Sequence, residues 1–263
     1  MKFNLKDHPI IGMIHLPSLT GQSTKKMESI IEYTLSEAVV LDDLSYSGIM
    51  IENFNDSPFV KTQVEDEVLI RISTILHEVK KHIKIPIGVN LLRNACVQAM
   101  KVATVLDLSF IRCNIWESAY VTDQGIIEAA ALDVINCKRN MNSDVKILAD
   151  VHVKHAKLIG DFSVIESAEN ALERGKADQI IISGISTGSS PDLNKLKLLN
   201  EHNIKPIIGS GMSLENLESF SQYISGAIIG TSIKKNREVT SIIDKTQAEK
   251  FIYEWKRTFE SFS

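Results

Sequence analysis

The sequence has few cysteines, few aromatic residues and no long hydrophobic run, and each shortage excludes a class of protein. Only 3 of the 263 residues are cysteine, and 6% are aromatic. Cys96, Cys113 and Cys137 are scattered, with neither the spacing of a zinc finger nor the even number of a disulfide framework. We therefore expect a reducing, cytoplasmic compartment. No stretch approaches the roughly 18 apolar residues of a membrane span, so any membrane association is expected to be peripheral.

The sequence also lacks a strong excess of either charge. It has 29 Lys and Arg against 33 Asp and Glu, a net charge of −4, which gives no overall attraction for nucleic acid. The lysine pairs Lys80-Lys81 and Lys234-Lys235 are interpreted as solvated ends of helices or loops rather than as a basic patch.

What the chain does have is a regular alternation of short apolar runs, rich in Ile and Val, with amphipathic helical patterns. Alternation of this kind predicts parallel strands joined by helices. Eight strand–helix units in 263 residues predict a single (β/α)8 TIM barrel of the phosphate-binding type, one domain over residues 1–263. The alternative, an open doubly wound sheet, lacks its Gly-x-Gly-x-x-Gly turn after the first strand. The predicted strands are 9–14, 48–51, 86–89, 109–114, 145–150, 179–183, 206–208 and 225–229, and the predicted helices include 28–44, 64–83, 95–106, 126–136, 163–174, 192–200 and 247–259.

Two of these strands end in glycine next to a hydroxyl residue. Pro206-Ile207-Ile208 runs into Gly209-Ser210-Gly211, and the last strand runs into Gly230-Thr231. Glycines let backbone N–H groups approach an anion, and the last two strand ends are where many TIM barrels bind phosphate. The sequence thus predicts a phosphate-binding cup. Its expected members are Ser183, Gly184, Gly209, Ser210, Gly211, Gly230 and Thr231.

The other strands end in ionisable and amide side chains, which converge on the barrel mouth whatever their distance in sequence. Glu52 and Asp150 are predicted as an acid–base pair. The alternative for Glu52, Arg112 and Asp150 is a structural layer of ion pairs that closes the barrel. Asp123-Gln124-Gly125 is interpreted first as a turn and helix start, and second as a loop that closes on substrate. The predicted substrate-binding residues are His15, Asn53, Asn90, Arg112, Asn114 and Asp123.

The densest group of ionisable residues is Asp150-Val151-His152-Val153-Lys154-His155. If this segment is extended, Asp150, His152 and Lys154 lie on one side of it, so all three are predicted as catalytic. Lys154 could be an electrophilic cation, a phosphate ligand or a Schiff-base amine. Asp150, His152 and His155 are weak candidates for a divalent metal, because Asp-x-His-x-x-His is not an established metal spacing. No cofactor is otherwise expected.

Several long motifs resemble the BtpA family, which includes the SgcQ-type proteins. They are PIIGMIHLPSLTG at 9–21, IMIENFNDSPF at 49–59, IPIGVNLLRN at 85–94, FIRCNIWESAYVTDQGIIE at 110–128, ILADVHVKHA at 147–156, ISGISTG at 182–188 and IIGSGMSLEN at 207–216. The resemblance implies a phosphate-binding barrel. It also implies a link to a photosystem I assembly factor of thylakoid membranes, and to proteins found beside sugar-uptake and sugar-phosphate genes. It implies no particular reaction.

The sequence therefore favours an enzyme that acts on a phosphorylated small molecule, a sugar phosphate or a nucleoside-derived phosphate. The expected chemistry is that of a lyase or aldolase, an isomerase, or an enzyme that cleaves a glycosidic bond. Two alternatives remain open: a non-catalytic assembly protein of the BtpA type, and a sensor that binds phosphometabolites without turnover. A homo-oligomer is expected because the outer helix faces are rich in Ile and Leu.

Overall fold

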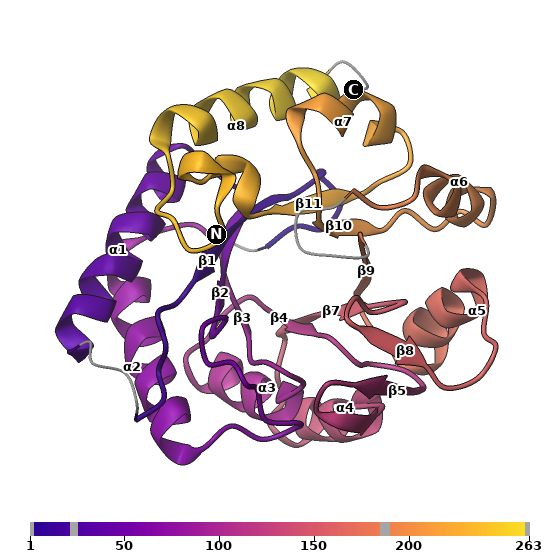
Figure 1. Cartoon of the computed structure of the whole chain (residues 1–263), viewed down its shortest axis with the longest axis horizontal. Coiled ribbons are helices and arrows are strands. Elements are labelled where there is room, and N and C mark those ends of the chain that lie inside the picture. Colours follow the sequence, from indigo (N-terminus) through magenta and orange to yellow (C-terminus); the bar gives the residue numbers. More distant parts are fainter. Residues whose placement is uncertain (1–2, 22–25, 185–189, 261–263) are drawn as a thin grey trace.

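Eight parallel strands form a closed barrel in the computed structural model, which describes residues 3–21, 26–184 and 190–260 (Figure 1). The strands follow the circular order β1-β11-β10-β9-β7-β4-β3-β2, and β1 closes the ring by pairing with β11. The predicted TIM barrel is thus confirmed. Residues 185–189, part of the ISGISTG motif, lie outside the described residues. The barrel strands are β1 (Ile10–His15), β2 (Gly48–Glu52), β3 (Ile87–Asn90), β4 (Phe110–Cys113), β7 (Lys146–Asp150), β9 (Gln179–Ser183), β10 (Ile207–Ser210) and β11 (Gly226–Ile229).

The helices surround the barrel and follow its strands along the chain (Figure 1). The segment 163–174, predicted as one helix, forms a short α-helix that continues as a π-helical segment. Two 3-10 turns follow the last strand, Thr231–Ile233 and Lys235–Arg237. The α-helices are α1 (Met27–Asp43), α2 (Asp66–His82), α3 (Cys96–Val105), α4 (Ala131–Asn140), α5 (Val164–Glu169), α6 (Leu193–Glu201), α7 (Leu214–Ser221) and α8 (Lys245–Glu260), and the π-helical segment is Asn170–Arg174.

The apolar core has two layers, because successive strand residues face opposite sides of the barrel wall. The larger layer lies between the strands and the helices. The smaller one fills the barrel interior, and Phe3 adds to it by stacking on Phe110 with ring centroids 4.3 Å apart. A Cβ at Gly88 would lie 2.1 Å from the Phe110 ring, so glycine is what lets this ring occupy the interior. The interior residues are Ile11, Met13, Met50, Phe110, Leu148, Ile181, Ile207 and Ile228.

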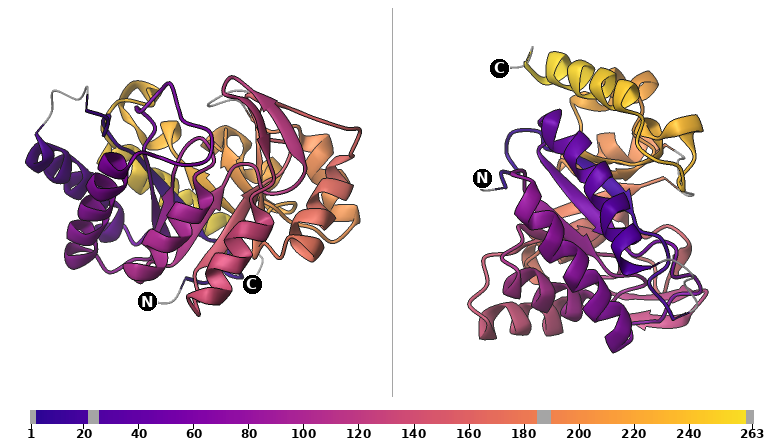
Figure 2. Two further views of the ribbon diagram at one scale, coloured as in Figure 1. Left: turned by 90° about the horizontal axis from the view of Figure 1, so that it is seen from below. Right: turned by 90° about the vertical axis from the view of Figure 1, so that its left-hand side faces the viewer.

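A small antiparallel sheet, absent from the sequence prediction, stands beside the mouth. It consists of β5 (Ala119–Thr122), β6 (Gly125–Glu128) and β8 (Ala156–Leu158), in the order β6-β5-β8. Its hairpin projects on the side of the barrel opposite the N-terminus (Figure 2). The helix predicted from Ile126 is therefore wrong for its first residues: they form β6, and α4 begins at Ala131.

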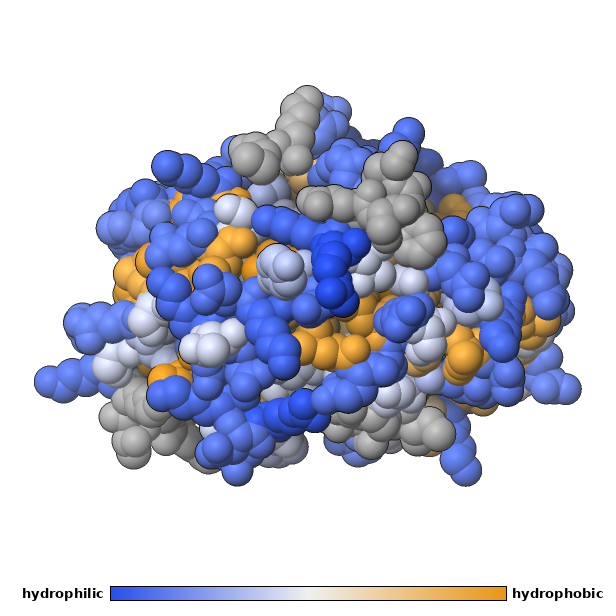
Figure 3. Space-filling model, turned by 90° about the horizontal axis from the view of Figure 1, so that it is seen from above, coloured by the Kyte–Doolittle hydropathy of each residue, from blue (hydrophilic) through white to orange (hydrophobic). Residues whose placement is uncertain are grey.

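The outer surface over α7 and α8 is mostly hydrophilic, with apolar residues showing between charged ones (Figure 3). None of the helices in the described part of the chain is long and apolar enough to cross a membrane. The homo-oligomer expected from the sequence stays a prediction.

Candidate functional site

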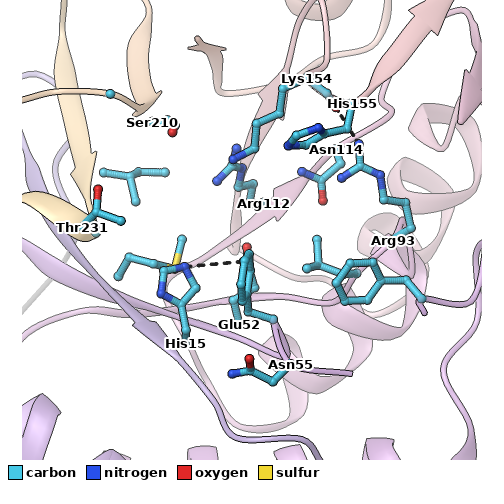
Figure 4. A pocket seen from close by; sticks show the side chains of 18 of the residues that line it. His15, Glu52, Asn55, Arg93, Arg112, Asn114, Lys154, His155, Ser210 and Thr231 are labelled. Atoms are coloured by element: carbon cyan, nitrogen blue, oxygen red, sulfur yellow. Dashed lines mark hydrogen bonds and ion pairs between the residues drawn. The ribbon is translucent and has the colours of Figure 1, made fainter. Parts of the chain in front are cut away.

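A cavity of about 420 Å³ lies at the carboxyl ends of the barrel strands, a size typical of small-molecule sites (Figure 4). The structure brings most of the predicted site residues to it, from strands that lie far apart in sequence. The predicted residues that line the cavity are His15, Glu52, Arg112, Asn114, Lys154, Gly209, Ser210, Gly211, Gly230 and Thr231.

One wall of the cavity is formed by the loops after β10 and β11, as the glycine pattern predicts. Gly211 has a φ of +85°, which glycine adopts without strain. Its carbonyl oxygen accepts a hydrogen bond of 2.8 Å from Nδ2 of Asn216, which fixes the loop. A Cβ at Gly209 would lie 2.4 Å from Ile181 and 2.7 Å from Ser183, so only glycine fits there. Ser183 lies behind this wall, and its buried Oγ has no hydrogen-bond partner.

Glu52, at the end of β2, is a buried carboxylate held by one amide. Nδ2 of Asn90 donates a 2.6 Å hydrogen bond to Oε2 of Glu52, while Oε1 lies 3.9 Å from Nε2 of His15. Oδ1 of Asn90 is buried without a partner. Burial and the charges of Lys234, Lys154 and Arg112 hold the pKa of His15 well below its usual value, so the imidazole is neutral.

Behind His15 lies Lys234, a residue that the sequence analysis placed wrongly. Lys234 is not a solvated loop end: only 1% of it is exposed, whereas its neighbour Lys235 is exposed. Its Nζ donates to the carbonyl of Val239 at 2.8 Å and lies 3.2 Å from Nδ1 of His15. Burial lowers its pKa to about 8, against the opposing charges of Glu37 and Glu52. One feature of the sequence could have indicated that Lys234 belongs to the site: it follows Thr231, in a predicted phosphate loop, by three residues.

The floor of the cavity holds a buried ion pair between β4 and β7. Nε and Nη2 of Arg112 donate to the two oxygens of Asp150 at 2.7 and 2.8 Å, and Nδ2 of Asn114 adds a third bond at 3.1 Å. Burial alone would lower the pKa of Arg112, but the charge and hydrogen bonds of Asp150 raise it. Asp150 does not line the cavity. This arrangement favours the structural ion-pair alternative for Asp150 over the role of a general base.

The segment after Asp150 is not extended, so the predicted alternation is wrong. His152 and His155 have φ values of +51° and +55°, which turn the chain towards β8. Lys154 enters the cavity, and His155 lies at its exposed rim. His152 instead contacts the backbone of Phe162 and Ser163, outside the cavity lining. Burial and the neighbouring Arg112 lower the pKa of Lys154.

Arg93 is a further lining residue, outside the predicted substrate-binding set. It follows β3, is 6% exposed, and donates from Nη2 to the carbonyl of Lys154 at 2.7 Å. Its Nε is buried without a partner. Burial lowers its pKa. The sequence could have indicated Arg93 as a site residue, because it lies three residues beyond Asn90, at the end of a predicted strand.

Besides Asn90, Asp150, His152 and Ser183, three further predicted residues lie outside the cavity lining. Asn53 supports the mouth loops, since its Nδ2 donates to Asp56 at 3.1 Å and its Oδ1 accepts from the backbone of Leu92 at 2.8 Å. Asp123 is exposed in the hairpin turn, so the predicted turn is confirmed, but the predicted helix start is wrong because β6 begins at Gly125. Gly184 is buried just before residues 185–189. Within the described ranges, no group of three His, Cys, Asp or Glu side chains is placed to hold a metal ion, so Asp150, His152 and His155 are not brought together.

Comparison with known proteins shows similarity along nearly the whole chain. Residues 6–257 match the BtpA family. A protein of Methanocaldococcus jannaschii is 38% identical over 250 residues, which cover 94% of this chain and 95% of that one. The photosystem I biogenesis protein BtpA of Synechocystis is 35% identical over 93% of this chain and 87% of its own. The solved N-(5'-phosphoribosyl)anthranilate isomerase of Pyrococcus furiosus shares the fold, with a TM-score of 0.57, 14% identity, and coverage of 95% of this chain and 100% of that one.

Proposed function

This chain belongs to the BtpA family, and within that family we propose that it is an enzyme that acts on a phosphorylated small metabolite by acid–base chemistry. A sugar phosphate or a nucleoside-derived phosphate is the proposed substrate. The observation that carries the proposal is the cavity itself, where a buried carboxylate, Glu52, shares one enclosed space with Arg112, Lys154 and the glycine loops after β10 and β11. The proposal treats the whole chain as one catalytic domain.

The glycine loops support a phosphate at one end of the substrate. Gly209, Gly211 and Gly230 line the cavity, together with the hydroxyl residues Ser210 and Thr231. Phosphate binding at the last two strand ends is common among TIM barrels. The isomerase that shares this fold is named for a phosphoribosyl substrate.

The amide side chains support a substrate that carries hydroxyl groups. Because the amide nitrogens of Asn90 and Asn114 donate to Glu52 and Asp150, their oxygens are left as acceptors. Both oxygens are buried without a partner. Buried acceptors are rarely left unsatisfied in proteins, and a sugar hydroxyl would donate to Oδ1 of Asn114, the one of the two residues that lines the cavity.

We assign the proton transfer to Glu52, because one of its oxygens is held by Asn90 while the residue lines the cavity. Lys154 would stabilise negative charge that develops on the substrate, since an ammonium in an enclosed site acts more strongly than in water. Asp150 would act as a positioning residue that orients Arg112 and Asn114. These roles suit an isomerase, a lyase or an enzyme that cleaves a glycosidic bond.

A second candidate function is assembly of a protein complex without catalysis. The relative from Synechocystis is named a photosystem I biogenesis protein. An assembly factor of that kind has no need of a buried carboxylate beside cavity-lining cations. A sensor would use the same cavity but show no turnover.

The test is a thermal-shift screen of the intact chain against inorganic phosphate, ribose and hexose phosphates and nucleoside monophosphates, with and without Mg²⁺. A ligand at 100 times its Kd stabilises the fold by about 2.7 kcal/mol. The variant Gly230→Asp places a negative charge in the glycine loops. A Cβ at this position meets no atom nearer than Cε1 of His15 at 3.5 Å, which is an ordinary contact, and the Tm of the variant without ligand checks that it folds. Asn203→Asp is the matched control, because it adds the same charge at an exposed position with a φ of +60°.

We expect at least one phosphate compound to raise the Tm, and this rise to be lost in Gly230→Asp but kept in Asn203→Asp. Every bound compound is then assayed for turnover. Absence of any phosphate-dependent shift would favour the assembly function, and binding without turnover would favour the sensor.

A further inference from the structure

We infer that the cavity has an apolar ring subsite, formed by Phe54, Phe59 and Leu92, that binds a planar base, and that the substrate is a nucleoside monophosphate. The inference rests on the proposed function and decides between the two substrate classes named there. A plain sugar phosphate would leave this subsite unused.

The first observation is the apolar surface that these residues present. The chain has 9 phenylalanines among 263 residues, yet Phe54 and Phe59, both in the loop after β2, line the same cavity. Both are half-buried, so part of each residue stays accessible instead of being packed in the core. Leu92 adds a buried apolar residue to the lining. Sugar hydroxyls would find no hydrogen-bond partner on these side chains, whereas a planar ring would gain contact area.

The second observation is that Phe59 and Leu92 lie on segments joined by hydrogen bonds. The backbone N–H of Arg93 donates to the carbonyl of Val60 at 3.0 Å, which ties the loop after β3 to the loop after β2. Phe59 and Leu92 are the residues immediately before this pair in the chain. Oδ1 of Asn53, at the start of the first loop, accepts from the backbone of Leu92 at 2.8 Å. The ring subsite is therefore formed before a ligand arrives, which lowers the cost of binding.

Phe54 is held separately, at the side of His15. The two ring centroids lie 4.7 Å apart at an interplanar angle of 59°. The next residue, Asn55, donates from Nδ2 to the carbonyl of Leu16 at 2.7 Å, so the loop that carries Phe54 is fastened to the end of β1. The Phe54 ring is thus fixed at the edge of the cavity.

The third observation is where the ring subsite lies. Figure 4 shows Arg93, which follows Leu92 in the chain, on the side of the cavity opposite Ser210 and Thr231. Glu52 and Asn114 lie between the two sides. A nucleoside monophosphate with its phosphate at the glycine loops would have its base at the ring subsite and its ribose in the middle. The buried, unpartnered Oδ1 of Asn114 would accept from a ribose hydroxyl there.

The test compares ligands that share a phosphate and a ribose and differ in the base. Ribose 5-phosphate and the 5'-monophosphates of adenosine, guanosine, cytidine and uridine are titrated calorimetrically into the intact chain. Glucose 6-phosphate is a larger sugar phosphate without a planar ring. We expect at least one nucleotide to bind about tenfold or more tightly than both sugar phosphates, as stacking of a base on an aromatic side chain gives.

The variant Phe59→Ala removes one ring of the subsite. We expect it to reduce the affinity for that nucleotide to the affinity for ribose 5-phosphate, with the latter unchanged. Phe59→Tyr keeps the ring and should keep the nucleotide affinity. Phe162→Ala is the matched control, because Phe162 is 41% exposed and lies outside the cavity lining. The Tm of each variant is measured, and Phe59→Leu provides the same comparison if Phe59→Ala does not fold.

The outcomes separate the two proposals. Binding of a sugar phosphate as tightly as every nucleotide, or nucleotide binding that is unchanged in Phe59→Ala, overturns the ring subsite and leaves the proposed function standing. Nucleotide binding that survives Gly230→Asp but is weakened in Phe59→Ala supports the ring subsite and overturns the phosphate site. Failure of every compound to bind overturns both.

Discussion

Nζ of Lys234 lies 3.2 Å from Nδ1 of His15, and the two residues are 219 positions apart in the sequence. An ammonium group can donate to Nδ1 only when that nitrogen carries no proton. The neutral imidazole then has its proton on Nε2, the nitrogen nearer to Glu52. The contact therefore links the tautomer of a ring beside the proposed proton-transferring group to the charge of Lys234.

Lys234 should make stability depend on pH. Burial lowers its folded pKa to about 8, from 10.5 for a free lysine, so between these pH values the unfolded chain binds more protons than the folded one. The free energy of unfolding attributable to Lys234 therefore rises with pH over this range, by about 3 kcal/mol at most. We expect Lys234→Met to remove this rise in urea titrations between pH 7 and 10. The control Lys235→Met, at an exposed position, should keep it, and parallel curves for wild type and Lys234→Met would contradict the prediction.

Glu52→Gln should separate activity from folding. Glutamine keeps an oxygen that accepts from Asn90, and it removes a buried charge, so we expect the Tm to stay equal or rise. The affinity for the phosphate compound should change less than threefold, while kcat falls by about 100-fold or more. Calorimetry and a turnover assay measure the two effects. A variant that retains the wild-type kcat would exclude Glu52 as the proton-transferring residue.

Asp150→Asn should act mainly on stability. The substitution leaves the Arg112 guanidinium buried without its counter-charge, which costs about 3 to 5 kcal/mol. Arg112→Met should cost a similar amount, whereas the double variant should cost clearly less than the sum of the two, because neither charge is then left alone. Urea denaturation of the four proteins gives the coupling energy. Additive losses would show that the pair does not act as a unit.

Gly209 and Gly230, in the loops after β10 and β11, should tolerate a methyl group differently. Gly209→Ala would overlap Ile181 and Ser183 at 2.4 and 2.7 Å, so we expect a loss of about 1 to 3 kcal/mol. Gly230→Ala serves as the control, because its Cβ would make only ordinary contacts. Thermal denaturation of both variants measures the difference, and equal Tm values would contradict the packing seen at Gly209.

The barrel was predictable because each of its strands is a short apolar run that ends in a polar or glycine residue. Residues at the carboxyl ends of these strands were therefore predicted to lie at the barrel mouth, as Glu52, Arg112 and Gly209 do. It could not find β5, β6 and β8, since Ile126 and Ile127 fit a helical face as well as a strand. These residues form a strand because Val121 pairs with Ile126 in β6 on one side and with Lys157 in β8 on the other.

The details of the site depended on contacts that a sequence does not display. His152 lies outside the cavity lining because the chain adopts a positive φ at this residue, which no local sequence pattern indicated. Lys234 resembles any lysine in a polar loop until the loop after β11 is folded over His15. The ion pair of Asp150 with Arg112 was only an alternative in the sequence analysis, because the two residues lie on neighbouring strands and are 38 positions apart in the sequence.

The pairing of β1 with β11 has a consequence for synthesis of the chain. His15 and Glu52 are synthesised well before Gly230, Thr231 and Lys234, which follow them by more than 170 positions. The register that closes the barrel joins Ile11 to Ile228, so the cavity has its full lining only after the first and last strands meet. A ligand that contacts both His15 and Thr231 would therefore bind only after β1 has paired with β11, and its binding would report on ring closure itself.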